Sequence, residues 1–523
     1  MNIDVVIFLV YLFILLCIGM YFSRKASKSP DSYLLGDRKV GPAVTALTMQ
    51  STSMSGFMFL GGPALAFQHG WYAIMYAIGD AGGGIINLSV LGKRMRRMSE
   101  ILGALSPIEY LEKRFKSPAV RIVGSIIATV FLFAYVFAQF LAAGKALESL
   151  TGWKYEWAVV IGVGVIVVYT VAGGYLAVVW TDFFQALVML IGVTAILVVA
   201  LMHVGGLSGL NESLGAINPS YLSIWGKDYI YYGQWGVILG SSLIYMIGYM
   251  GLPHVVVRHM SMESTKTVKS ATLWSALYNQ FFAYSPYILG LIGIVLLPNL
   301  SDPEMVIPTL AYTFFPAVIA ALLLSAVMAA IMSTSDSILM QAGTILSRDV
   351  YQRFINKNAS PTKMILVSRL SILFAGIVGI LVAIIQPPKV FDLVIFAFGT
   401  MGNSFMVSYI AAVYWKKANS VGVLCSMIGG GLTNILWTAF DWQAVTGLHP
   451  FLAGLLISII GMIVGNLFGK PPTPEMEEVF KEAQGPRKLP KKVEQNIAQD
   501  IGPEARVIAD FMKQKPSVQG LER

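Results

Sequence analysis

The chain has 523 residues, of which 56% are hydrophobic and only 12% are charged. Soluble globular proteins carry about 25% charged residues, so this chain has too few charges to cover a soluble surface of its size. The composition therefore excludes a disordered chain, a fibrous repeat and an ordinary cytosolic enzyme, and it indicates a protein that crosses the membrane several times. Because the chain has only two cysteines, a disulfide framework and a cysteine-rich metal site are also excluded.

Apolar segments long enough to cross a membrane follow one another along most of the chain. A spanning helix needs about 20 mostly apolar residues. Thirteen segments meet this requirement: 3–22, 42–69, 71–91, 119–147, 156–174, 179–204, 233–256, 270–298, 306–346, 364–387, 391–415, 418–440 and 448–469. The first has neither a preceding basic residue nor a small-residue cleavage site, so we expect it to remain a helix. The ninth is too long for one crossing, and we expect its membrane helix to begin near Pro316.

The basic residues predict which side each loop faces, because cytoplasmic loops carry an excess of Lys and Arg. With the N-terminus outside, 32 of the 37 Lys and Arg residues lie in cytoplasmic segments and four lie in external loops. The sequence therefore predicts an external N-terminus, a cytoplasmic C-terminus and a solvated cytoplasmic tail over 470–523. The net charge of +9 then reflects orientation beside lipid headgroups, and no nucleic-acid partner is expected.

Two of the apolar segments are interrupted by polar and helix-breaking residues. They read TALTMQSTSMSG over 45–56 and YMIGYMGLPH over 245–254. Such interruptions at membrane depth are tolerated only where the backbone faces protein or a wet cavity. A packing kink is the plainer explanation of one break, but two breaks in corresponding positions of a repeat indicate a transporter binding site.

The breaks occupy corresponding positions if spans 2–6 and 7–11 are inverted five-helix repeats. The predicted organisation is an extra helix and cytoplasmic loop (1–41), a first repeat (42–204), an external loop (205–232), a second repeat (233–415), two additional helices (416–469) and the tail (470–523).

A cluster of polar side chains lies in the ninth segment, where residues 332–337 read MSTSDS. A single Ser or Thr usually bonds back to its own helix. The four hydroxyls around Asp336, in this same short stretch, are harder to explain in this way. Together with carbonyl groups freed by the break in the second segment, they suit a cation.

Three motifs carry a resemblance to a known family. They are GGYLAVVWTDFFQ (173–185), LSAVMAAIMST (324–334) and GYMGLPH (248–254). On these motifs the chain resembles the sodium/solute symporter family over about residues 1–470. The resemblance implies an all-α, leucine-transporter-like fold of two inverted five-helix repeats, in the plasma membrane.

The resemblance also implies sites for the co-transported sodium ion. One sodium would be held by the carbonyl oxygens of Ser51, Met54 and Ala330 and by the hydroxyls of Ser333 and Thr334. Some members bind a further sodium near the signature aspartate, here Asp182, whose partners would be Ser333, Asp336 and Ser337. A structural role for Asp182 as a helix cap explains this residue as well as a role in binding sodium does.

The substrate positions implied by the resemblance lie in three segments: Ser53, Ser55, Gly56, Tyr135, Gln139, Tyr245, Tyr249 and Pro253. Some of the motifs resemble the proline symporters and others the pantothenate symporters. We therefore expect sodium-coupled import of proline or a related amino acid by alternating access. The alternative is a sodium symporter for pantothenate or another small carboxylate.

Two departures from the proline symporters concern carboxylates. Ser53 stands where they carry an aspartate, and Asp336 stands where relatives are hydroxylic or apolar. This suggests the hypothesis that the carboxylate of the cation site has moved to Asp336. Asp80 lies in the middle of the third segment, and a functional carboxylate and a buried neutral one both remain open there.

The sequence gives less support to functions of other classes. An intramembrane enzyme using Ser337 or Ser55 would need a nearby base, and the histidines lie near span ends. A channel or sensor is expected to show a repeated filter or an appended domain. His254 is expected to end a helix, and Arg258 and His259 to anchor the cytoplasmic face. The expected partners are a small solute and the lipid bilayer, and the oligomeric state stays open.

Overall fold

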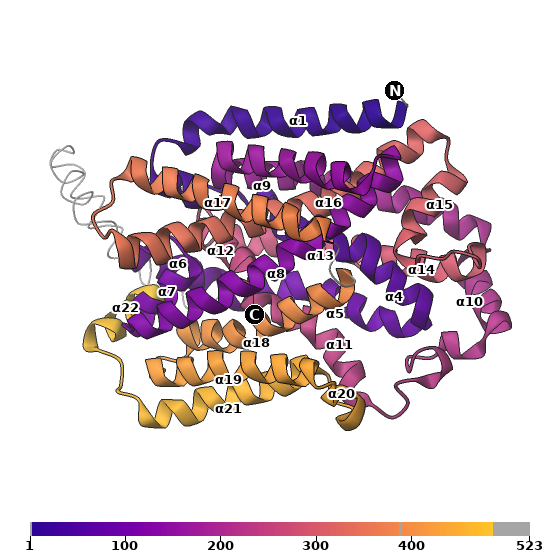
Figure 1. The fold of residues 1–523 in the computed structure, drawn as a ribbon. Helices are drawn as coiled ribbons and strands as arrows, with labels where there is room; N and C mark the ends of the chain where they lie inside the picture. Colours follow the sequence, from indigo (N-terminus) through magenta and orange to yellow (C-terminus); the bar gives the residue numbers. More distant parts are fainter. Residues whose placement is uncertain (1–2, 386–389, 485–523) are drawn as a thin grey trace, which may run out of the picture.

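The structure is a computed structural model that describes residues 3–385 and 390–484, which form helices joined by short loops (Figure 1). In this part of the chain, ten helices are long and apolar enough to cross a membrane, or eleven if one bent pair counts as a single span. An all-α protein with many membrane helices is therefore confirmed. The number thirteen and the sides of the two termini stay predictions.

The first half of the chain follows the predicted segments. The observed helices are α1 (Ile3–Ala26), α2 (Pro30–Leu35), η1 (Gly36–Arg38), α3 (Pro42–Ser53), η2 (Phe57–Gly61), α4 (Gly62–His69), η3 (Gly70–Ala73), α5 (Ile74–Asn87), η4 (Leu88–Gly92), α6 (Lys93–Ile101), α7 (Pro107–Phe115), α8 (Pro118–Thr151) and α9 (Tyr155–His203). Within α9, Gly174 adopts φ 57° and ψ −155°, which only glycine tolerates readily. This kink coincides with the boundary predicted between the fifth and sixth segments.

The second half begins after the external-loop segment. Its helices are α10 (Gly206–Ile217), η5 (Pro219–Leu222), η6 (Lys227–Tyr229), α11 (Trp235–Gly248), η7 (Tyr249–Gly251), α12 (Pro253–Ser261), α13 (Thr267–Phe282), α14 (Ser285–Leu296), η8 (Pro303–Met305), α15 (Val306–Phe314), α16 (Ala317–Thr344), η9 (Ile345–Ile355), α17 (Pro361–Ile384) and α18 (Val390–Tyr414). The membrane helix α16 starts directly after Pro316, as predicted. The end of the tenth predicted segment, 386–387, lies outside the described residues.

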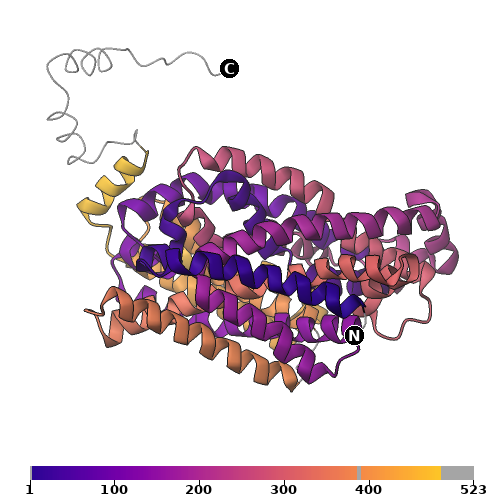
Figure 2. The same ribbon diagram turned by 90° about the horizontal axis from the view of Figure 1, so that it is seen from above.

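The helix α16 is the most enclosed of the long helices. In its most apolar stretch 78% of the residues are buried, compared with 28% in α1. Accordingly, α1 lies along one edge of the bundle (Figure 1) and over the other helices when the molecule is seen from above (Figure 2). Polar residues on α16 therefore face other helices rather than lipid.

The C-terminal part contains α19 (Ser420–Ala439), α20 (Trp442–Thr446), α21 (Pro450–Phe468) and α22 (Pro474–Gln484). The amphipathic helix α22 packs its apolar face on the connecting helices α6 and α7. Met476 and Phe480 are each 3% exposed, and the guanidinium of Arg114 lies 4.5 Å from the ring centre of Phe480. The stretch 474–484 of the predicted solvated tail therefore forms a helix that buries the apolar residues Met476 and Phe480 and exposes most of the others. The residues from 485 onward lie outside the described part.

Candidate functional site

The break in the second segment lies at Met54 and Ser55. The helix α3 ends at Ser53, and Met54 has non-helical φ −87° and ψ 76°. The amide of Gly56 donates to Oε1 of Gln139 on α8, at 2.9 Å. A side chain from α8 thus satisfies a backbone group that the break leaves without a helical partner.

The break in the seventh segment bends α11 against α12 by 51°. Leu252 is extended between them, and Pro253 begins α12, where its missing N–H costs nothing. The hydroxyl of Tyr249 lies 3.3 Å from the carbonyl oxygen of Ser53, so the two breaks meet. Both predicted interruptions are confirmed, and residues almost 200 positions apart form one site.

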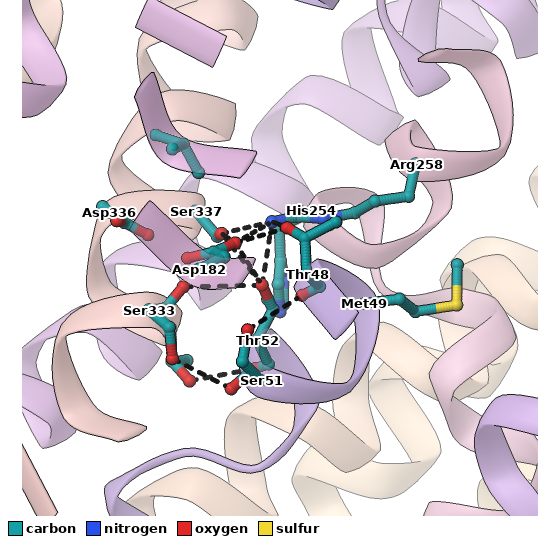
Figure 3. A network of polar contacts seen from close by, with 12 residues as sticks. Thr48, Met49, Ser51, Thr52, Asp182, His254, Arg258, Ser333, Asp336 and Ser337 are labelled. Atoms are coloured by element: carbon teal, nitrogen blue, oxygen red, sulfur yellow. Dashed lines mark hydrogen bonds and ion pairs between the residues drawn. The ribbon is translucent and has the colours of Figure 1, made fainter. Parts of the chain in front are cut away.

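Oxygen atoms from α3 and α16 converge beside the first break. The hydroxyl of Ser333 lies 3.0 Å from the carbonyl oxygen of Ser51 and 3.1 Å from that of Ala330. The hydroxyl of Thr334 lies 2.9 Å from the carbonyl oxygen of Thr52 and 3.2 Å from that of Ala330. Figure 3 shows this contact between the two helices. The donor set contains only neutral oxygens, which suits a monovalent cation such as sodium.

Four of the five positions expected to hold sodium therefore lie together: Ser51, Ala330, Ser333 and Thr334. Met54 is 1% exposed and directly follows the last turn of α3, but none of its hydrogen bonds reaches α16. Thr52 was not among the predicted residues. Its place in the last turn of α3, where carbonyl groups lose their helical partners, is the signal that could have identified it.

A second polar network surrounds the guanidinium of Arg258, which is 1% exposed. Its Nη2 lies 3.1 Å from Oδ2 of Asp182, 2.8 Å from the hydroxyl of Thr52 and 3.4 Å from that of Thr48, and it also bonds to Ser337. These oxygens come from α3, α9 and α16 (Figure 3). The charge of Arg258 thus lies among oxygens that include two of the positions expected to hold a second sodium.

Three predictions about these residues are wrong. Arg258 and His259 do not anchor a membrane face, because Arg258 is buried against Asp182 and His259 is fully buried beside Asn87. Asp182 does not cap a helix, since it lies within α9. His254 is the second residue of α12 and so starts a helix rather than ending one. The five-residue spacing of Arg258 from the break at Pro253 is the signal that could have placed it inside.

The structure does not bring Asp336 into either oxygen cluster. Its Oδ2 accepts a hydrogen bond from the hydroxyl of Tyr169 on α9, at 2.6 Å, and Figure 3 shows its carboxylate apart from the network of Asp182. Ser333 and Ser337 are four residues apart and share the face of α16 toward α3. Asp336 is rotated from Ser337 by about 100°, so it faces another neighbour.

The predicted substrate residues gather around an aromatic cluster at the two breaks. The ring of Tyr245 lies 5.7 Å from that of Tyr249, 5.2 Å from Phe57 and 4.8 Å from Phe398. Tyr135, Gln139, Ser53, Ser55, Gly56 and Pro253 are buried beside the breaks. Phe57 and Phe398 were not predicted; Phe57 follows the first break directly, and nothing in the local sequence marks Phe398 on α18.

A cavity of about 310 Å³ leads toward this cluster from the side predicted to be external. Its lining includes Tyr76, Ile244 and Phe396, and the ring of Tyr76 lies 5.9 Å from that of Tyr245. On the opposite side, Tyr175 and Arg258 line a space too small for water. The packing around Arg258 therefore leaves no room for water on the side predicted to be cytoplasmic.

Comparisons with known proteins give the same picture. A model of the sodium:solute symporter family matches residues 33–430. The osmoregulated proline transporter OpuE of Bacillus subtilis is 30% identical over 488 residues, which are 92% of this chain and 98% of that protein. A sodium/proline symporter of Staphylococcus aureus is 31% identical over 479 residues, which are 88% of this chain and 92% of that protein.

Among solved structures, a Na⁺-coupled sialic acid symporter in a substrate-bound outward-open state matches with a TM-score of 0.73. The two chains are 23% identical, and the match covers 90% of this chain and 99% of that one. MhsT in complex with L-phenylalanine matches with a TM-score of 0.52 at 12% identity, over 82% of this chain and 98% of that one. These similarities confirm the predicted leucine-transporter-like fold.

Proposed function

We propose, from the premise that this chain belongs to the sodium:solute symporter family, that its solute is proline or a closely related amino acid. The chain is a multi-pass protein of the plasma membrane and a sodium-coupled symporter. The choice of solute follows from the relatives named above, and the observation that carries the coupling of solute to sodium is the segment 51–56. One end of this segment contacts the hydroxyl oxygens of α16 that are expected to bind sodium, and the other end contacts the aromatic cluster.

Sodium binds, in this proposal, between α3 and α16. The hydroxyls of Ser333 and Thr334 turn from the carbonyl groups of α3 toward the ion, and the carbonyl groups then face the ion as well. The ion thereby fixes the end of α3 and the non-helical Met54 that follows it. Because the same segment borders the substrate, each ligand raises the affinity for the other.

The break in the seventh segment contributes the other half of the substrate site. Tyr245 and Tyr249 lie where α11 ends, and α12 begins at Pro253 beside them. The positive N-terminal end of α12 suits the carboxylate of an amino acid. Rings of this size give an apolar wall for a small side chain or for the pyrrolidine ring of proline.

Transport follows from closing one side and opening the other. The external-side cavity beside Tyr76 admits the solute, and a rearrangement around Arg258 opens the closed side. The inward sodium gradient drives the cycle, and the membrane potential adds about 2.3 kcal/mol per 100 mV for each charge that crosses. Pantothenate is the less favoured solute, because the relatives matched over nearly the whole chain are proline transporters.

No covalent chemistry is part of this proposal. The hydroxyl of Ser337 is bonded to Arg258, and the hydroxyl of Ser55 accepts the amide of Phe57 at 3.2 Å. Within 3–385 and 390–484, neither serine forms a hydrogen bond with a histidine that could serve as its base.

Uptake of labelled proline into proteoliposomes tests the proposal. An inward sodium gradient should drive accumulation above the external concentration, and an equal potassium gradient or a sodium ionophore should abolish it. Excess pantothenate should not compete. The variant Ser333→Ala should raise the sodium concentration needed for half-maximal uptake at least tenfold. Absence of gradient-driven accumulation of proline and other amino acids would reject the proposed function.

A further inference from the structure

A buried carboxylate without a counter-ion lies beside the aromatic cluster. Asp80 of α5 is 2% exposed. Its Oδ1 accepts a hydrogen bond from the hydroxyl of Tyr249, and its Oδ2 has no hydrogen-bond partner among the described residues. In that same part of the chain, no Lys, Arg or His forms an ion pair with Asp80.

The packing of α5 fixes this carboxylate at the substrate site. Gly79 and Gly83 are four residues apart and face α11 at close range. A Cβ added to Gly79 would lie 2.2 Å from the carbonyl oxygen of Ser242, and one added to Gly83 would lie 2.6 Å from that of Tyr245. Asn279 of α13 donates to the backbone carbonyl of Asp80 at 2.9 Å. Asp80 is therefore held from two sides.

A single hydroxyl connects Asp80 to the break in α3. The hydroxyl of Tyr249 touches the carboxylate of Asp80 and lies 3.3 Å from the carbonyl oxygen of Ser53. The ring of Tyr245 packs against that of Tyr249, and the hydroxyls of Tyr245 and Tyr287 have no hydrogen-bond partner among the described residues. Polar groups without hydrogen-bond partners and the faces of aromatic rings thus lie around the same position in the site.

This combination suits a positively charged amino group. Aromatic faces attract cations through the ring quadrupole. A buried carboxylate without a partner is costly, and an ammonium group that donates N–H bonds supplies both the missing charge and the missing donors. A quaternary ammonium would supply the charge but no donor.

We propose that Asp80 receives the ammonium group of the substrate. The carboxylate of Asp80 selects amino and imino acids, whose ammonium group carries N–H donors. It discriminates against ring carboxylates that have no ammonium group and against quaternary ammonium compounds. This inference rests on the proposed function for its site, and it names a specificity-determining residue on the third predicted segment. The group opposite it, the substrate carboxylate, faces the start of α12.

A binding measurement tests the proposal separately from transport. Purified full-length protein in detergent with sodium is titrated with proline, alanine, cyclopentanecarboxylate, tetrahydrofuran-2-carboxylate and proline betaine, and the melting temperature is recorded. Cyclopentanecarboxylate and the furan analogue keep the ring size and carboxylate of proline but lack the ammonium. We expect proline to bind the wild type at least a hundredfold more tightly than either.

The variant Asp80→Asn should lose at least tenfold in proline affinity. The affinity for proline divided by the affinity for cyclopentanecarboxylate should also fall at least tenfold, because the amide of the variant carries no charge. A merely structural role for Asp80 would weaken both ligands together and leave this ratio unchanged. Asp80→Glu, which keeps the charge, should retain a ratio closer to that of the wild type.

The matched control is Asp336→Asn. Asp336 is also fully buried, with one oxygen bonded to a tyrosine and the other without a hydrogen-bond partner in the described part of the chain. It faces α9, so its amide variant should leave the affinity ratio unchanged, whatever its effect on uptake. Equal narrowing in both variants would overturn the proposal.

Other results also overturn it. These are an Asp80→Asn protein with an unchanged ratio, a wild type stabilised by neither proline nor alanine, and an Asp80→Asn protein whose stabilisation by sodium alone is lost, which would make Asp80 a sodium ligand. If the ratio behaves as expected while wild-type proteoliposomes accumulate neither proline nor another amino acid, the proposed function fails and the role of Asp80 stands.

Discussion

At the scale of single residues, Arg258 shows how this fold accommodates a charge in its interior. An uncompensated charge in the membrane interior is costly, and such residues pair with one another or face a cavity. Arg258 meets Asp182 and three hydroxyl groups at once. Both partners depend on this contact, because each would otherwise be a buried charge without compensation.

The pair formed by Arg258 and Asp182 gives a prediction for stability. Arg258→Gln should destabilise the protein by about 3 kcal/mol or more, because it leaves Asp182 unpaired. Combining it with Asp182→Asn removes both charges, so the double variant should be less destabilised than the two single variants predict together. Thermal unfolding of the four proteins in detergent measures this coupling. Strictly additive losses would contradict it.

At the scale of elements, the site depends on how closely the end of α3 approaches α8 and α16. Gly56 has no space for a side chain, because a Cβ there would lie 2.9 Å from Cγ1 of Ile331 and 3.0 Å from Cβ of Ala142. The short residue therefore lets the break contact both helices. The same approach brings the carbonyl groups of Ser51 and Thr52 to the hydroxyls of α16.

The variant Gly56→Ala should reduce sodium-driven uptake at least fivefold, since the added methyl group must displace the break from α8 or α16. Uptake and sodium-dependent thermal stabilisation should fall together. Gly164→Ala is the matched control, because nothing lies within 4 Å of a Cβ at this position of α9. A Gly56→Ala protein with normal sodium dependence would refute the close-approach argument.

The connection between α7 and η9 is a second element-scale contact. Glu109 is 2% exposed, and its carboxylate accepts hydrogen bonds from Nε and Nη2 of Arg348, at 3.0 Å and 2.8 Å. Burial alone would raise the pKa of Glu109, but its hydrogen bonds and the charges of Arg348 and Lys113 lower it to about 2. The ionised side chain thus fastens two elements that flank α8.

This lowered pKa predicts a pH dependence of stability. The stabilisation is present above the ordinary pKa of about 4.5 and is lost as the pH falls toward about 2. Glu109→Gln should therefore be less stable than the wild type at pH 7, by up to about 3 kcal/mol. The difference should shrink below pH 4.5 in thermal unfolding. Glu212→Gln, at an exposed position of α10, is the control and should show no such trend.

At the scale of the whole molecule, the chain beyond the last long helix returns to the bundle. Lys116 pairs with Glu475, and Lys416 lies 3.0 Å from Glu477. Arg114 adds its contact with the ring of Phe480 while its Nε donates to the carbonyl oxygen of Ala412 at 3.0 Å. The helix α22 thus connects the loop before α8 with the loop after α18.

The docking of α22 rests mainly on its apolar face, because exposed ion pairs contribute little. Phe480→Ala should release the helix and speed tryptic cleavage at Lys481 severalfold, while the melting temperature of the membrane bundle stays nearly unchanged. Glu478→Ala, at an exposed position of the same helix, should cleave like the wild type. Equal cleavage of the two variants would show that the apolar contact does not hold the helix.

The sequence by itself determined the membrane class, the positions of the breaks at Met54 and Leu252, and the sodium-type pairing of Ser333 and Thr334 with α3. These follow from apolar length, helix-breaking residues and the family motifs, all of which are local in the chain. Only the tertiary structure decided which buried charges meet. It placed Arg258 against Asp182, turned Asp336 toward α9 and brought Asp80 to Tyr249. The reason is that the direction in which a helix turns its side chains depends on contacts with segments far away in the chain. A charged residue in an apolar run carries no local sign of its partner.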